Sequence, residues 1–496
     1  MIEQIMALKK FILKKEFFLF LFLIAAIAAT RSYTWFNNYL MLDDVNHILD
    51  ARVIYSHMAI PVMGPSLAGR GAYIPGGGYY ILLSIPALLF SQPVGFFIYS
   101  AVLMICSAAF FLFTISRHYG TSVMLLLASL LLFSPRMMLM ESGMWNPYYA
   151  VMLSLILASI LIEIFSGRDD PLLLFLLLPL SALMSQVHFT AFFYLPLILA
   201  VYFIFFYRGR NSSYFWLGTI GAVLIYLPYL FTEIGNHFHN TLAILSMREG
   251  TGPSFPVLSY LLLFPSLDFM ISGYISDGLR FLATLPWYAL WPLTAVYIIS
   301  LVLTTSAFIY CVWALFKERD LNRLDKEVLK FYFLVLGGLV FAFTVFGIPS
   351  YPTHYYYPAY SFSFFPMLLL FRRISQTTGK LNNLKTAASA LFITAGSILS
   401  LYYFVNVISP FSLPRQYGYI NALLDDANGR PFDIRTEYEK FFYEHTARDI
   451  LHRAWNEKPG AVLRYIIDKK VNLTNNGTMV RIYGDDLMGL YRVSGR

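Results

Sequence analysis

Residues 17–47 read FFLFLFLIAAIAATRSYTWFNNYLMLDDVNH, an apolar run that leads into two adjacent acidic residues. The run is long enough to cross a bilayer as a helix, and the lysine-rich residues before it predict a cytoplasmic N-terminus. A secretory signal peptide has a similar outline, but the apolar character continues through Trp35 and Leu40. This favours a retained first span at about 17–36, and it places Asp43 and Asp44 outside the membrane.

The composition defines the class of protein. Of the 496 residues, 58% are hydrophobic and only 13% are charged. Apolar runs of spanning length recur along the chain and are continuous rather than alternating, which predicts transmembrane helices and excludes a β-barrel. The net charge of +8 lies mainly in short loops, so it indicates topology and not nucleic-acid binding. The two cysteines lie in apolar runs and imply neither a disulfide framework nor a thiolate metal site.

The distribution of basic residues predicts the topology. Arginines and lysines gather in alternate loops, which indicates about eleven spans with the N-terminus inside and the C-terminus outside. Two long external segments result, residues 37–94 and 233–287. The first contains an amphipathic helix expected at Val45–Met58, with Val53 on its apolar face, and a short interfacial or re-entrant helix at Tyr79–Phe90.

The composition becomes soluble from about residue 410. A helical stretch is expected at residues 438–455, and strand-like runs lie at Met479–Tyr483 and Gly489–Val493. We therefore expect an all-α polytopic membrane domain with external juxtamembrane helices over residues 1–409. A small external α/β domain follows over residues 410–496.

The acidic pair is the first candidate for chemistry. Aspartate is a favoured residue before a helix, so Asp43 and Asp44 could simply cap the helix expected from Val45. In a chain with so few charges, however, two carboxylates at a membrane face indicate a functional site. A carboxylate in this position could act as a general base.

Other polar residues of the outer loops also have two interpretations. Arg70 and Arg136 could bind a phosphate or be solvated loop charges, and Trp145 could anchor the membrane interface or stack on a ligand. His188 could be a packed histidine or a ligand-binding one, while His354 lies among tyrosines that could line a lipid or sugar cleft. A third set could bind a metal ion, but the spacing of its two histidines disfavours this: Glu233, His237 and His239.

The order of these motifs resembles the GT-C class of membrane glycosyltransferases, in particular the lipid-carrier-dependent subgroup with protein O-mannosyltransferases and the aminoarabinose transferase of lipid A. The matching elements are one span followed by an acidic pair, Gly64-Pro65, Gly78-Tyr79-Tyr80, Trp145-Asn146-Pro147, Gln186 with His188, Leu227-Pro228-Tyr229 before Glu233, and His354-Tyr355. The resemblance covers about residues 15–405. The chain departs from the family at Asp44, where glutamate is commoner, and at Pro75-Gly76-Gly77-Gly78, which replaces a proline pair.

The resemblance implies inverting transfer of a sugar from a polyprenyl phosphate to a glycan, lipid or protein acceptor, in a bacterial inner membrane with the active site and C-terminus on the periplasmic side. Asp43 matches the catalytic position, and which of the two aspartates is the base stays open. The other expected site residues fall into two groups. Donor phosphate and lipid binding is expected at Arg70, Arg136, His354 and Tyr355, and substrate binding at Tyr79, Tyr80, Trp145, Asn146, His188 and Glu233. No cofactor is expected, with a bound divalent ion left open.

Two alternatives differ in the residues that they require. A polymerase or ligase of lipid-linked glycans would use external arginines such as Arg248 or Arg280. A transporter or flippase would place polar groups at mid-membrane depth, and few of the expected spans carry any.

Overall fold

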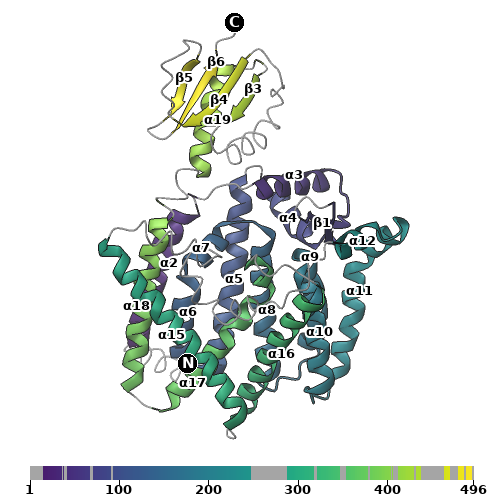
Figure 1. Ribbon diagram of the computed structural model, residues 1–496, viewed down its shortest axis with the longest axis vertical. Coiled ribbons are helices and arrows are strands. Elements are labelled where there is room, and N and C mark those ends of the chain that lie inside the picture. The colour runs from purple at the N-terminus through teal and green to yellow at the C-terminus, as the bar shows by residue number, and fades with distance from the viewer. Residues whose placement is uncertain are drawn as a thin grey trace, which may run out of the picture.

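The computed structural model describes residues 15–35, 37, 42–67, 71–90, 93–246, 287–317, 321–346, 353–377, 380–403, 405, 412–428, 430, 432–436, 463–469, 479–484 and 488–493. Figure 1 shows a bundle of helices, with short elements gathered at one end and a small sheet beyond them. The bundle helices are α2 (Lys15–Thr34), α5 (Pro93–Tyr119), α6 (Thr121–Leu132), α7 (Pro135–Ser142), α8 (Asn146–Phe165), α9 (Pro171–Val187), α10 (Thr190–Phe205), α11 (Ser212–Gly235), α15 (Trp287–Lys317), α16 (Arg323–Val345), η2 (Thr353–Phe364, a 3-10 helix), α17 (Phe365–Thr377) and α18 (Lys380–Tyr403).

Several of these helices start where the sequence supplies a cap. The side chain of Ser134 accepts a hydrogen bond from the backbone of α7, that of Asp170 from α9, and that of Asn322 from α16. Proline follows directly at the start of α7 and α9, where its missing N–H is not needed. Short polar punctuation between apolar runs therefore sets the helix boundaries.

Within the described part of the chain, five helices are long and apolar enough to cross a membrane: α5, α8, α11, α16 and residues 294–317 of α15. α6 and α7 are bent by 72° and together form a further candidate, and α9 and α10 are shorter apolar helices. Side chains such as Leu224 and Phe231 on α11 are exposed, as expected of a lipid-facing surface. The chain is a multi-pass membrane protein. Most of the expected spans fall on these helices, while the total of about eleven stays a prediction.

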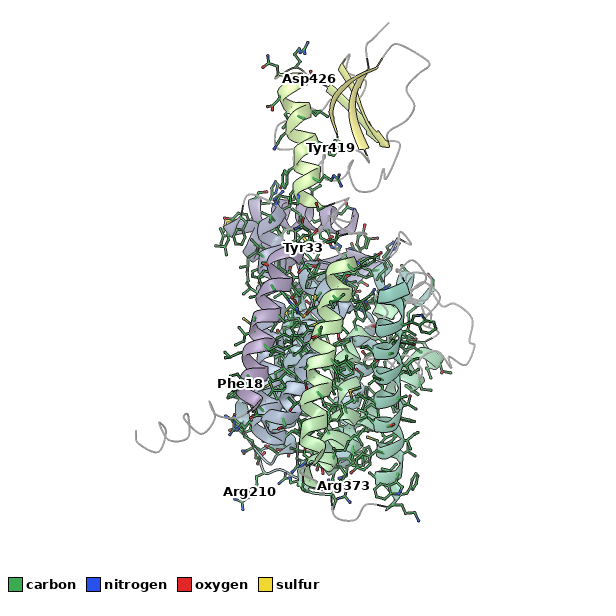
Figure 2. The ribbon with its side chains drawn as sticks, turned by 90° about the vertical axis from the view of Figure 1, so that its left-hand side faces the viewer. Phe18, Tyr33, Arg210, Arg373, Tyr419 and Asp426 are labelled. Atoms are coloured by element: carbon green, nitrogen blue, oxygen red, sulfur yellow. The ribbon has the colours of Figure 1, made fainter. Side chains whose placement is uncertain are left out.

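One end of the bundle carries basic residues in short ion pairs. Glu163 at the end of α8 contacts Arg117, His118 and Arg168, and Arg372 pairs with Asp325. Figure 2 shows Arg210 and Arg373 at this same end. These are residues of the loops that the charge pattern assigns to the inner side.

The opposite end carries the short elements α3 (Leu42–Ser56), β1 (Met63–Ser66), β2 (Tyr73–Pro75), α4 (Gly78–Leu89) and α12 (His239–Ser246). β1 and β2 form an antiparallel hairpin, and α3 packs on α4. The expected short helix after Tyr79 is thus confirmed as α4. The expected start of α3 at Val45 was wrong, because the helix already begins at Leu42, so Asp43 and Asp44 lie inside its first turn.

The buried face of α3 also differs from the prediction. Ile48, expected on the apolar face, is buried as predicted, but Val53, expected on the same face, is exposed. Asp44, His47 and Ala51 are buried beside Ile48. These four residues have the spacing of one helix face. The reason is the partner surface, because α4 presents tyrosine hydroxyls that hydrogen-bond polar side chains of α3.

Beyond this end lies a four-stranded sheet of order β3-β4-β6-β5, formed by β3 (Phe432–Thr436), β4 (Leu463–Lys469), β5 (Met479–Gly484) and β6 (Met488–Val493). β3 and β4 are parallel and the other pairs antiparallel, and α19 (Leu413–Ala427) lies against β5. The two expected strands are confirmed as β5 and β6. The helix expected at 438–455 lies outside the described residues, and a domain boundary near 410 stays a prediction.

Candidate functional site

The buried face of α3 is joined to α4 and to the turn before α8 by one tyrosine. The Tyr79 hydroxyl donates to the Met144 carbonyl oxygen at 2.5 Å and lies 3.1 Å from Nδ1 of His47. Burial lowers the pKa of His47 to about 3, so its imidazole is neutral at physiological pH. Asp44 is one helical turn before His47 on the same face and is 1% exposed. An acidic group and a neutral histidine thus line the inner side of α3.

The neighbouring tyrosine makes a separate contact. The Tyr80 hydroxyl donates to Oδ2 of Asp50 at 2.7 Å, at the outer edge of α3. Asp43 lies in the same turn as Asp44, at the start of α3. The hydroxyls of the tyrosine pair that heads α4 therefore bond two different residues of α3.

Arg136 is carried by the first turn of the short helix α7. Ser134 and Pro135 start this helix, and the Nε of Arg136 donates to the Tyr357 hydroxyl at 2.8 Å. The guanidinium also lies over the Tyr357 ring, 5.7 Å from its centroid. The bend between α6 and α7 turns this cation toward η2.

Aromatic rings surround His354 on η2. Its ring centroid is 4.7 Å from that of Trp145, 5.8 Å from that of His188 and 4.6 Å from that of Tyr355. Burial and the nearby Arg136 lower the pKa of His354 to about 3. His354 is therefore a neutral hydrogen-bonding group, and Arg136 supplies the positive charge of this cluster.

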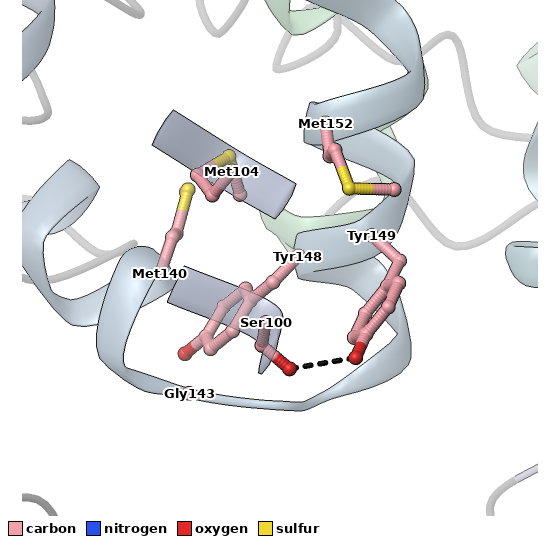
Figure 3. A pocket seen from close by; sticks show the side chains of 7 residues that line it. All are labelled: Ser100, Met104, Met140, Gly143, Tyr148, Tyr149 and Met152. Atoms are coloured by element: carbon pink, nitrogen blue, oxygen red, sulfur yellow. Dashed lines mark hydrogen bonds between the residues drawn. The ribbon is translucent and has the colours of Figure 1, made fainter. Parts of the chain in front are cut away.

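A small cavity lies between these two sets of residues, and Figure 3 shows the side chains that line it. On one side is Tyr149, whose ring contacts that of Tyr79 and whose hydroxyl lies within electrostatic reach of Asp44. On the other side is Tyr148, whose ring contacts those of Trp145 and Tyr357. The remaining lining residues are Ser100, Met104, Met140, Gly143 and Met152. Acidic and cationic groups thus flank one cavity.

Two amides hold the segments around this cavity. Asn146 Nδ2 donates to the Val187 carbonyl at 2.9 Å and ties the start of α8 to the end of α9. Gln186 accepts from the Gly78 amide and donates to the Ile225 carbonyl, both at 2.9 Å. The second bridge joins the start of α4 to α11, and Asn146 and Gln186 thereby position the sequence-predicted motifs relative to one another.

Glu233 lies apart from this cluster. Its Oε2 accepts hydrogen bonds from the amide and hydroxyl of Thr241, and its Oε1 from the amide of Asn240. A carboxylate at these first amides stabilises the start of α12. Asn240 in turn bonds the backbone of Tyr73 on β2. The structure therefore gives Glu233 a clear role in holding α12 and the hairpin.

Three of the sequence-predicted candidates lie outside the described residues. They are Arg70, Arg248 and Arg280. Among the residues that the structure does describe, no three or more His, Cys, Asp or Glu side chains are grouped to hold a metal ion.

Four further residues have contacts that sequence reasoning did not assign: His47, Thr190, Tyr357 and Arg31. Arg31 could have been noticed, because it is a charged residue within the expected first span. His47 could have been noticed from its position one turn after Asp44. Tyr357 belongs to the tyrosines noted around His354, but nothing in the local sequence predicts its contact with Arg136 or marks Thr190, since their partners are far away along the chain.

No family model matches the chain, and no curated protein is similar to it in sequence. Two solved structures of similar architecture are of ArnT from Cupriavidus metallidurans, one bound to undecaprenyl phosphate and one in the apo state. Each is 11% identical and the similarity covers 95% of this chain and 97% of the other, with TM-scores of 0.49 and 0.47.

Proposed function

We propose that this protein is an inverting glycosyltransferase that moves a sugar from a polyprenyl phosphate to an acceptor hydroxyl. The observation that carries the proposal is the cavity with Asp44 and Tyr79 near one wall and Trp145, Tyr357 and Arg136 near the other. A base on one side and a cation on the other suit transfer between an acceptor and a phosphate leaving group.

In this mechanism a carboxylate of the Asp43–Asp44 pair takes the proton of the acceptor hydroxyl. The hydroxyl oxygen bonds to the anomeric carbon from the side opposite the phosphate. The bond from that carbon to the phosphate oxygen breaks, and its electron pair stays on the phosphate, so the configuration inverts. Arg136 stabilises the developing negative charge, and the neutral His354 can donate a hydrogen bond to it. The donor already carries the activating phosphate, so we expect no cofactor.

The site lies at the end of the bundle opposite Arg210 and Arg373 (Figure 2). Because basic loops favour the cytoplasmic side, this arrangement supports a site on the external face. The C-terminal sheet extends from the same end as the site, so we propose that it is external too. The lipid chain of the donor would lie against exposed aliphatic side chains of the bundle.

The test is sugar transfer from radiolabelled polyprenyl-phosphate sugars to membrane acceptors by purified protein in detergent. We expect Asp43→Asn or Asp44→Asn to lower transfer by about 100-fold or more, because loss of a general base typically has an effect of this size. Asp50→Asn is the matched control, since Asp50 is an exposed aspartate on the same helix and asparagine still accepts the Tyr80 hydrogen bond. Near-normal transfer by both the Asp43 and Asp44 variants would overturn the proposal.

A further inference from the structure

His188 heads a short chain of hydrogen bonds at the edge of the site. Its Nδ1 lies 2.8 Å from the Thr190 hydroxyl, and this hydroxyl donates to the Tyr355 carbonyl oxygen at 2.9 Å. A threonine hydroxyl has one proton and can donate only one hydrogen bond. The direction of the second bond therefore decides the direction of the first.

A proline explains why the Thr190 hydroxyl donates to Tyr355. Tyr355 lies in the 3-10 helix η2, where each carbonyl normally accepts from the amide three residues later. That residue is Pro358, which has no N–H. Pro358 therefore cannot donate to the Tyr355 carbonyl in the 3-10 pattern. The Thr190 hydroxyl supplies the missing hydrogen bond.

With its proton directed at Tyr355, the Thr190 oxygen can only accept from His188. Nδ1 of His188 must then carry the ring proton, which leaves Nε2 with a free lone pair in the neutral imidazole. Burial, followed by the nearby His354, lowers the pKa of His188 well below its usual range, so the ring is neutral. Among the described residues, Nε2 of His188 has no hydrogen-bond partner.

The other side of the cavity repeats this arrangement. The Tyr79 hydroxyl donates to the Met144 carbonyl, so it accepts from Nδ1 of His47. The first chain of hydrogen bonds ends at Tyr355, which follows His354 in the sequence, and the second ends at Met144, which precedes Trp145. The rings of Trp145 and His354 contact each other. Two hydroxyls thus connect two neutral histidines to opposite sides of that ring pair.

We infer that Thr190 is a positioning residue that holds His188 in the Nδ1–H tautomer, so that Nε2 accepts a hydrogen bond from a substrate hydroxyl. The tautomer follows from the contacts alone. The identity of the hydroxyl, on the transferred sugar or its acceptor, rests on the proposed function. Tyr79 holds His47 in the same tautomer.

The tautomer is measurable without any substrate. Nitrogen NMR of ¹⁵N-histidine-labelled full-length protein distinguishes a protonated from a lone-pair ring nitrogen, and the His188 signals are assigned by their loss in His188→Gln. We expect a protonated Nδ1 and a bare Nε2 in the wild type and in Thr190→Ser, and a mixture or the reverse tautomer in Thr190→Val. A wild-type His188 protonated at Nε2 overturns the inference, and this result does not depend on the Thr190 variants.

Transfer kinetics test the role toward substrate. Loss of one oriented hydrogen-bond acceptor predicts that Thr190→Val lowers kcat/KM by about 10-fold or more, while Thr190→Ser restores it. If Thr190→Val changes the tautomer but leaves kcat/KM unchanged, the role of Nε2 toward substrate is wrong. A wild type without transfer activity would count against the proposed function, and the NMR result would still decide the tautomer.

Discussion

Arg31 and Glu141 form a buried, bidentate ion pair between α2 and α7. Nε of Arg31 lies 2.7 Å from one carboxylate oxygen and Nη2 lies 2.8 Å from the other, and the guanidinium also donates to the Leu132 carbonyl. Both side chains are at most 3% exposed. The pair therefore fixes the last turn of α7, the helix whose first turn carries Arg136.

Removing one partner of this pair should be strongly destabilising. We expect Glu141→Gln or Arg31→Met to lower the free energy of unfolding by about 3–5 kcal/mol, because the remaining charge stays buried without its partner. The double variant Arg31→Met/Glu141→Leu should recover most of this loss. Denaturant unfolding of the detergent-solubilised protein measures both effects.

The matched control is an exposed pair at the other end of the bundle. Arg117 contacts Glu163, but its side chain is 54% exposed, so Arg117→Met should change stability by about 1 kcal/mol or less. Equal losses for Arg117→Met and Arg31→Met would show that burial of the Arg31 pair has no special effect. A double variant as unstable as the singles would show that packing, and not charge, is decisive.

Gly76 allows the close approach of Gln186 that positions α4. Its φ is +93°, and a Cβ there would lie 2.2 Å from Nε2 of Gln186. Gly71 also has a positive φ, of +73°, but a Cβ there would meet nothing within 4 Å. We expect Gly71→Ala to cost about 1–2 kcal/mol of stability from the backbone alone, and Gly76→Ala clearly more. Comparison of the two unfolding curves separates the backbone and steric contributions, and equal costs would contradict the role of Gln186.

Local patterns predicted the features that depend on neighbouring residues. The apolar runs, the short helix α4, and the strands β5 and β6 all follow from periodicity and composition within a few residues. The pairing of Arg31 with Glu141 joins residues 110 positions apart, so no local pattern contains it. The strands β3 and β4 pair in parallel across a long connection and were missed for the same reason.

The buried face of α3 shows a second limit of sequence reasoning. Hydrophobic periodicity placed Val53 inside, but the partner helix α4 offers the hydroxyls of Tyr79 and Tyr80. Polar residues of α3 can then be buried with hydrogen bonds, which periodicity does not consider. His47 is therefore buried with its contact to the Tyr79 hydroxyl. The role of the acidic pair in the candidate site stays a prediction, and the structure shows that one of its members, Asp44, is buried.

His47 should make stability depend on pH. Burial lowers the pKa of His47 from its ordinary value of 6.5 to about 3 in the folded protein. As the pH falls, the unfolded chain therefore binds a proton at His47 before the folded protein does. The stabilisation is complete above about 6.5 and declines below it, by up to about 1.4 kcal/mol per pH unit. His47→Gln should flatten the dependence of the unfolding midpoint between neutral pH and about 5. His57→Gln, at an exposed site just beyond the same helix, should leave it unchanged. An identical pH profile for wild type and His47→Gln would contradict a neutral buried His47.

Glu233 offers a test between a structural role and the substrate contact expected from the sequence. Its carboxylate holds the start of α12, where His237 and Phe238 both have positive φ, and Asn240 links α12 to β2. If Glu233 acts through this link, Glu233→Gln should lower stability by about 1–2 kcal/mol, because it removes a charged hydrogen-bond acceptor. Asn240→Ala should then lower transfer as much as Glu233→Gln does, since each variant breaks the connection between α12 and β2 at a different residue. Unfolding curves and KM values for both variants decide between the two roles. A rise in KM for Glu233→Gln alone, with stability unchanged, would instead show that Glu233 binds substrate directly.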